Sequence, residues 1–120
     1  MININWEIEL YEKPNGRCPV ADFINKLSPK EKVIILNRFS QLQEHGLDLG
    51  RPLVGYLRDN IHELRIKINS VNYRILFFVY DRTIFVLTHV IIKKSDKVPD
   101  FEIEKAIEYR NSYIKSKLSK

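Results

Sequence analysis

The alternation of apolar and polar residues is clearest between Ile61 and Lys94. Three runs rich in Val, Ile, Phe and Tyr are separated there by polar breaks at residues 69–72 and 81–83. Successive side chains of a β-strand point to opposite faces of its sheet, so each run is typical of a strand. The short breaks predict tight hairpins, and the three runs together predict an antiparallel sheet.

Two turns determine which side chains share a face of this sheet. A first turn closed by residues 69 and 72 puts Lys67 opposite Arg74, and a second closed by residues 80 and 83 puts Arg74 opposite His89. One face is then apolar except for Thr88, and it collects Leu64, Ile66, Ile68, Tyr73, Ile75, Phe77, Val79, Ile84, Val86, Val90 and Ile92. The other face carries Leu76, Phe78, Phe85 and Leu87 beside a cationic cluster, which consists of Arg65, Lys67, Arg74, His89 and Lys93.

The apolar face is expected to pack on the core of the domain. Truncating Ile75 or Phe77 to Ala should therefore destabilise the fold by about 2–5 kcal/mol. The same change at Leu76 or Phe78 should cost less, unless another segment of the chain covers their face. A slip of one residue in any strand would exchange the two faces, so the sorting itself supports the register.

The segment before this sheet predicts one strand and two helices. Residues 4–11 alternate as in a half-buried strand. Apolar residues between positions 20 and 27 are spaced as one face of a short helix. Ser28 and Glu31 have the spacing of a capping box, so a second helix is expected to begin at Pro29 and to end at Gly46. The two helices predict an αα-hairpin that lies on the sheet.

The remaining segments predict an irregular connection, a basic loop and a last helix. Residues 47–60 contain two glycines and a proline and are typical of an irregular connection. Residues 93–97 form a polar, mostly basic loop. Pro99 is expected to open a helix whose apolar side carries Ile103, Ala106, Ile107 and Ile114. The order strand, two helices, three strands and helix predicts a compact α+β domain.

Length and composition limit the number of domains, the kind of partner and the cellular compartment. The 120 residues suit one domain, which we take to span residues 1–120. The formal net charge of +5 favours nucleic acid or an acidic partner. Cys18 is the only cysteine, which excludes an internal disulfide and suits a reducing cytosol. No apolar run has the length that a bilayer needs, so we expect a soluble, cytoplasmic protein with no membrane partner.

The cationic cluster is the strongest candidate for chemistry. The sequence contains no Gly-rich phosphate loop and no Cys/His set with zinc spacing. Arginines offer forked donors to phosphate oxygens, lysines add point charges, and a histidine can move protons near neutral pH. This residue set suits the cleavage of a phosphodiester by charge stabilisation, for which we expect neither a metal nor another cofactor.

Each member of the cluster also has a purely structural interpretation. His89 could be a packed, hydrogen-bonded histidine of a strand. Arg65 and Arg74 could be salt-bridge partners, with Glu63 as the obvious acid. The lysines of the basic loop could simply be solvated. His62 has the opposite strand parity and is expected to lie outside the cluster.

Three stretches of the sequence are informative when taken together. They are ELR at residues 63–65, YRILF at residues 73–77 and HVIIKKSDKVP at residues 89–99. With them the chain resembles the RelE/HigB-type toxins of type II toxin–antitoxin systems, in the HigB-like branch shared with phage-derived proteins. The likeness extends from residue 28 to residue 113. The chain departs from the family at Val90 and Ile91, where a small residue and an aromatic one are common, and at His62, where an aromatic residue is common.

The resemblance implies a RelE-like fold and a toxin that cuts messenger RNA on the ribosome under the control of a cognate antitoxin. The expected function is a metal-independent endoribonuclease, or mRNA interferase, that inhibits translation. The expected catalytic residues are Arg65, Arg74, His89 and Lys93. The expected RNA-binding residues are Lys67, Lys94 and Lys97.

Two other functions fit the same fold. The ParE-type toxins resemble this family and poison DNA gyrase by binding it, without nuclease chemistry. The third possibility is an inactive binding module of phage origin. RNA cleavage on ribosomes and supercoiling by gyrase would separate these functions.

Overall fold

Five β-strands form one sheet in the computed structural model, which describes residues 6–95 and 97–119. The strands are β1 (Glu7–Leu10), β2 (Val54–Arg58), β3 (Ile61–Ile68), β4 (Val71–Tyr80) and β5 (Ile84–Ile92). Their order across the sheet is β1-β5-β4-β3-β2, with β1 parallel to β5 and the other neighbours antiparallel. Ile4 and Asn5 of the predicted first strand and Asp96 of the basic loop lie outside the described residues.

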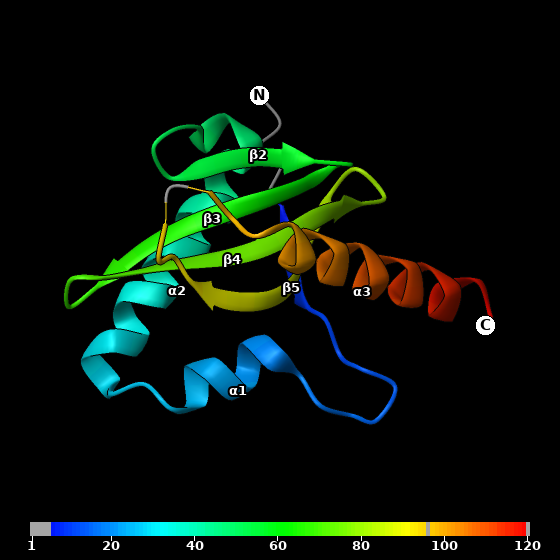
Figure 1. Ribbon diagram of the computed structural model, residues 1–120, viewed down its shortest axis with the longest axis horizontal. Helices are drawn as coiled ribbons and strands as arrows, with labels where there is room; N and C mark the ends of the chain where they lie inside the picture. Colours follow the sequence, from blue (N-terminus) through cyan, green and yellow to red (C-terminus); the bar gives the residue numbers. More distant parts are fainter. Residues whose placement is uncertain (1–5, 96, 120) are drawn as a thin grey trace.

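Helices cover both faces of the sheet (Figure 1). α1 (Pro19–Asn25) and α2 (Pro29–His45) form the αα-hairpin on one face, and a short 3-10 helix, η1 (Gly46–Leu49), follows them. α3 (Asp100–Leu118) lies on the opposite face. This arrangement confirms the predicted α+β fold with an N-terminal αα-hairpin and a C-terminal helix.

The sequence signals at both ends of α2 act as expected. The Ser28 hydroxyl accepts a hydrogen bond from the Glu31 amide at 3.3 Å, and the Glu31 carboxylate accepts one from the Ser28 amide at 2.8 Å. Each bond satisfies an amide that the first turn of a helix leaves without a partner. Gly46 ends the helix at a φ of +61°, and a Cβ there would collide with the indole of Trp6.

Apolar packing occurs on both faces of the sheet, whereas the pattern predicted one apolar face. A first core between the αα-hairpin and the sheet includes Leu64, Ile75 and Phe77. A second core between α3 and the sheet includes Leu76 and Phe78, which are 0% and 1% exposed. The expectation that truncation on this second face costs less therefore does not apply, because α3 covers it.

The β3–β4 turn is centred one residue earlier than predicted. Ile68 pairs with Val71, and residues 69 and 70 form the turn with φ values of +49° and +71°. Two left-handed residues are what a two-residue hairpin turn of type I′ requires. Arg65 consequently pairs with Arg74, so the predicted pairing of Lys67 with Arg74 is wrong. The shift amounts to two positions in the partner strand and leaves the side chains of β3 and β4 on their predicted faces.

The first half of β5 has the opposite orientation from the one predicted. Tyr80 pairs with Ile84 rather than with Thr83, because the loop that joins β4 to β5 has three residues. This odd shift exchanges the two faces. Two residues assigned to the cationic face enter the first core, namely Phe85 and Leu87. Two residues assigned to the apolar face pack against the second core instead, namely Ile84 and Val86.

A β-bulge restores the predicted orientation in the second half of β5. The register shifts between the Leu76 and Phe77 pairings and leaves Thr88 as the extra residue of β5. His89 then pairs with Leu76, and Arg74 pairs with Ile91, so the predicted pairing of Arg74 with His89 is wrong. His89 nevertheless lies on the predicted face, because Leu76 and Arg74 have the same parity in β4.

Residues 54–58 form strand β2, where the sequence predicted an irregular connection. The strand is short and contains Gly55, which weakens the pattern typical of a strand. Gly55 pairs with Glu63 of β3, so β2 extends the sheet beside the ELR stretch.

Candidate functional site

Two arginines and one glutamate form a charged group on the α3 face of β3 and β4. Arg65 and Arg74 are directly paired across the strands, an arrangement that is unfavourable for like charges unless an acid lies near them. Oε1 of Glu63 lies 2.7 Å from Nε of Arg74, and Oε2 of Glu63 lies 3.6 Å from Nη2 of Arg65. The Glu63, Arg74 and Arg65 side chains are 7%, 8% and 28% exposed. Glu63 is thus the salt-bridge partner of both arginines, as their purely structural interpretation predicted.

Gly55 leaves room for this charged group. A Cβ at this position would lie 2.8 Å from Nη2 of Arg65 and 3.2 Å from Oε2 of Glu63. Without a side chain there, Arg65 extends over β2 and donates a hydrogen bond to the Pro52 carbonyl at 3.3 Å. Because Arg65 is more exposed than Arg74, it is the arginine that a ligand can reach first.

His89 is buried beneath α3 and paired with a carboxylate. Its side chain is 6% exposed, and its Nε2 lies 3.2 Å from Oε1 of Glu102 in the first turn of α3. The ring also meets Tyr109 edge-on, with centroids 5.7 Å apart. Burial lowers the pKa of His89 below its ordinary value of 6.5, and the attraction of Glu102 offsets this effect only in part.

A neutral imidazole satisfies both neighbours of His89 in one tautomer. With the proton on Nε2, the ring donates to Glu102, and Nδ1 accepts from the Thr88 hydroxyl at 3.0 Å. The same hydroxyl lies 3.1 Å from the Leu76 carbonyl, so its single proton has two acceptors within reach. His89 and Glu102 therefore form a pair that can hold or exchange a proton.

A hollow of about 460 Å³ opens beside this pair, and we call it the basic hollow. It lies between the end of β5, the segment that follows it and the first turn of α3. Lys93, Lys94 and Lys97 line it together with Glu102, the residue that contacts His89. Lys93 is half-buried, and the other two lysines are exposed. The basic hollow thus combines cations with access to Glu102, whereas His89 is not among the residues that line it.

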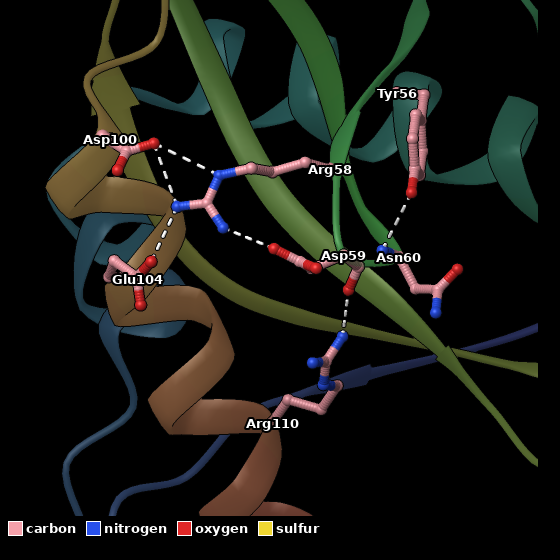
Figure 2. A network of polar contacts seen from close by, with 7 residues as sticks. All are labelled: Tyr56, Arg58, Asp59, Asn60, Asp100, Glu104 and Arg110. Atoms are coloured by element: carbon pink, nitrogen blue, oxygen red, sulfur yellow. Dashed lines mark hydrogen bonds and ion pairs between the residues drawn. The ribbon is translucent and has the colours of Figure 1, made fainter.

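Ion pairs hold the N-terminal half of α3 against the β2–β3 hairpin (Figure 2). Nη2 of Arg58 donates to Asp100 at 2.9 Å and to Glu104 at 2.7 Å, and Nη1 contacts the Asp59 carboxylate. Arg110 of α3 donates to the Asp59 carbonyl. The helix that covers His89 is therefore fixed by charged contacts as well as by the second core.

The structure brings the predicted site residues together in two groups. One group consists of Arg65 and Arg74 with Glu63. The other consists of His89 with Glu102 and the three lysines of the basic hollow. Lys67 lies apart, exposed on β3 opposite Asn72. His62 stacks on Phe77 on the other face of the sheet, with centroids 5.3 Å apart, so it lies outside the cationic cluster as expected.

Glu102 is the candidate residue that sequence reasoning missed. The helical pattern put it on the polar side of the last helix among many charged residues. Acidic residues are common in the first turn of a helix, where they favour the helix dipole, so Glu102 carried no distinguishing signal. Only the packing of α3 against β5 brings its carboxylate within 3.2 Å of His89.

Among residues 6–95 and 97–119, no group of three or more His, Cys, Asp and Glu side chains is arranged to hold a metal ion. In the same part of the chain, no helix is both long and apolar enough to cross a membrane.

The fold is compatible with a known class of protein. A largely antiparallel sheet with an αα-hairpin on one face and a C-terminal helix on the other is compatible with the RelE-like fold of toxins. Residues 22–111 match the family described as Phage derived protein Gp49-like (DUF891), and the match spans every predicted site residue. The chain therefore belongs to the Gp49-like family of phage-derived proteins, a family related to the toxins of toxin–antitoxin systems. No curated protein matches the chain.

Proposed function

We propose that this protein is the toxin of a type II toxin–antitoxin system and acts as a ribosome-dependent mRNA endoribonuclease of the HigB-like kind. One observation carries the proposal: the His89–Glu102 pair adjoins a hollow with three lysines, on the same face of the sheet as two arginines. This set combines groups that exchange protons with groups that attract phosphate. Membership of the Gp49-like family supports a toxin-related role.

In the proposed reaction, the 2′-hydroxyl of a messenger nucleotide attacks its own 3′ phosphate. The P–O2′ bond forms while the P–O5′ bond breaks, which leaves a 2′,3′-cyclic phosphate and a 5′-hydroxyl. The 2′-hydroxyl loses one proton and the 5′ oxygen gains one, and we assign these transfers to His89 together with Glu102. Lys93 stabilises the extra negative charge on the pentavalent phosphate.

Arg65 and Arg74 are assigned to the phosphate oxygens of the RNA. In the free protein Glu63 is the ion-pair partner of both guanidinium groups, so an incoming phosphate has to replace this carboxylate. Arg65 makes the first contact because it is the more exposed of the two. Lys67, Lys94 and Lys97 are assigned to the RNA backbone further from the cleaved bond.

Single-turnover cleavage of a messenger on purified ribosomes tests this activity. Lys93→Ala and Arg65→Ala should each slow cleavage by roughly 10²–10³-fold, the usual loss for one transition-state donor. His89→Gln should slow it by about 10²–10⁴-fold. Lys30→Ala, which removes an exposed lysine of α2, is the matched control and should cleave at the wild-type rate. Wild-type rates in all three folded site variants would contradict the assignment.

A cognate antitoxin is the expected protein partner of this toxin. A basic surface favours an acidic or amphipathic antitoxin segment that covers the cationic cluster or displaces α3. Co-expression of the neighbouring gene should relieve growth arrest and slow amide exchange at Arg65, Arg74 and His89. Protection confined to β1 and the αα-hairpin would instead indicate inhibition from a distance.

A ParE-like inhibitor of DNA gyrase is the alternative function. The burial of His89 and Arg74 is the observation that favours it, because a toxin that acts by binding needs no accessible group for proton transfer. Supercoiling by purified gyrase, assayed with the same protein preparation as ribosomal cleavage, separates the two functions. Inhibition of gyrase without RNA cleavage would support the alternative, and activity in neither assay would indicate a binding module.

A further inference from the structure

Two large apolar side chains are exposed in the basic hollow. Phe101, in the first turn of α3, is 69% exposed, and Ile92, at the end of β5, is 52% exposed. Both line the basic hollow together with its lysines. Covering such apolar surface with a ligand is favourable because it removes carbon surface from water. The basic hollow therefore offers an aromatic side chain and cations to the same ligand.

The acidic residues next to Phe101 already have partners of their own. Arg58 binds Asp100 and Glu104 at 2.9 and 2.7 Å (Figure 2). His89 contacts Glu102 at 3.2 Å, and burial of both side chains strengthens that contact. Asp100 and Glu104 repel an anionic ligand less than free carboxylates would, because Arg58 neutralises part of their charge, and Glu102 is held by a hydrogen bond from His89. A ligand with negative charge and an apolar ring fits this environment better than a purely apolar one.

We propose that Phe101 is a stacking platform for one nucleobase of single-stranded RNA, and that Lys93 and Lys94 bind the phosphates beside that nucleobase. This proposal rests on the RNA-directed function proposed above and adds a residue that positions the substrate. The volume of about 460 Å³ lies within the roughly 300–1,000 Å³ of ordinary ligand sites. Because Glu102 lines the same hollow as Phe101, a base stacked there brings its own phosphate towards the His89–Glu102 pair.

Stacking on Phe101 predicts a binding preference without a sequence code. Every nucleobase has a π-face, so an aromatic platform accepts all four bases. Phenylalanine has no hydrogen-bonding group and does not read the edges of a base. Unpaired RNA should bind more tightly than duplex RNA, because the bases of a duplex are stacked on one another. An acidic peptide segment is the competing occupant, and the experiment distinguishes it from RNA.

Fluorescence of a short single-stranded 2′-O-methyl RNA that contains 2-aminopurine tests the platform in the absence of ribosomes. The 2′-O-methyl group removes the attacking hydroxyl, so binding is measured independently of cleavage. Phe101→Ala should weaken binding by about 5- to 150-fold and abolish the quenching that stacking causes. Phe101→Trp should retain both signals, whereas Phe101→Leu should bind as weakly as the Ala variant. Leu118→Ala, which truncates a 79% exposed side chain near the end of α3, is the matched control.

Wild-type affinity in the Phe101→Ala or the Phe101→Leu variant would overturn the proposal. A Phe101→Ala variant that loses the cognate antitoxin but binds the RNA normally would overturn it as well, and would make the basic hollow a protein-docking site. Lys94→Ala should lower the salt dependence of RNA binding, because each phosphate contact releases counterions. If the wild-type protein binds the fluorescent RNA through Phe101 but cleaves no messenger on ribosomes, the stacking platform stands and the nuclease function fails.

Discussion

Glu63→Gln tests most directly how the charged group of β3 and β4 is built. The substitution removes one negative charge with little change of shape and leaves Arg74, whose side chain is 8% exposed, without the carboxylate 2.7 Å away. Arg65, its cross-strand neighbour, adds a second positive charge. Removing one partner of a buried ion pair costs about 3–5 kcal/mol, because the remaining charge stays desolvated. That cost is a large part of the roughly 5–15 kcal/mol by which domains are stable.

A double-mutant cycle followed by urea unfolding isolates this ion pair. The double variant Glu63→Gln/Arg74→Met should be more stable than the sum of the two single effects predicts, by about 1–3 kcal/mol. Arg65→Met is the matched control, because Arg65 lies 3.6 Å from Glu63 and is 28% exposed. Its loss should cost about 1 kcal/mol or less, as for exposed ion pairs. Additive effects, together with a cost below about 1 kcal/mol for Glu63→Gln, would refute the inference that the pair is buried.

Three further predictions concern the second core, the histidine and the ion pairs of α3. Leu76→Ala should destabilise the fold by about 2–5 kcal/mol, as much as Ile75→Ala, because Leu76 is 0% exposed beneath α3. Thermal melts that show less than half the cost of Ile75→Ala would argue against the second core. Burial lowers the pKa of His89 in the folded state, so below about pH 6.5 the unfolded chain binds more protons and stability should fall as the pH falls. Urea unfolding between pH 5 and pH 8 should show a shallower dependence in His89→Gln, and an unchanged slope would refute the assignment to His89. Arg58→Ala should speed amide exchange in the first two turns of α3, whereas Arg17→Ala, which breaks a surface pair with Asp22, should not. Equal exchange in the two variants would mean that apolar packing alone fixes the helix.

Burial also changes how activity losses at the site are interpreted. The sequence pattern put Arg65, Arg74 and His89 outside the predicted apolar face. Arg74 is nevertheless buried beside Glu63, and His89 is buried under α3, so their truncation disturbs packing as well as chemistry. Arg65 and Lys93 are more exposed, and losses of activity at these two positions report on chemistry more directly.

The hairpins of the sheet were predictable from the sequence, but the register of β5 was not. Residues 84–87 are apolar at every position, so a period of two cannot identify which face is which. Asp81 and Arg82 adopt positive φ values of 52° and 67°, and the loop takes up one residue more than the tightest turn would. The bulge at Thr88 then compensates for the extra residue. Parity arguments therefore succeeded for His89 and failed for Phe85 and Leu87, only a few residues earlier.

The candidate site was predictable as far as strand geometry determines it. Strand parity put Arg65, Arg74 and His89 on one face, and they do share the face that α3 covers. The basic hollow and the Glu102 carboxylate arise from the packing of a helix that is distant from the strands in sequence. No periodic pattern within a strand contains that information. β2 was not predicted for a related reason. Gly55 weakens the pattern of its own strand and leaves room for the side chains of Glu63 and Arg65 on the neighbouring strand.

The carboxylates of Glu63 and Glu102 lead to a last prediction about free and ribosome-bound messenger. Buried cations need acceptors before any RNA arrives, since an uncompensated charge destabilises the fold. Glu63 opposes the proposed substrate because a phosphate must replace its carboxylate 2.7 Å from Nε of Arg74, and the charge of Glu102 repels a phosphate that approaches His89. Contacts elsewhere, such as those that a ribosome makes with its messenger, have to offset this competition. We therefore expect free messenger to be cleaved at least about 10²-fold more slowly than the same messenger on ribosomes, the scale on which one lost transition-state contact acts. Equal single-turnover rates on the two substrates would show that the carboxylates do not limit access to the site.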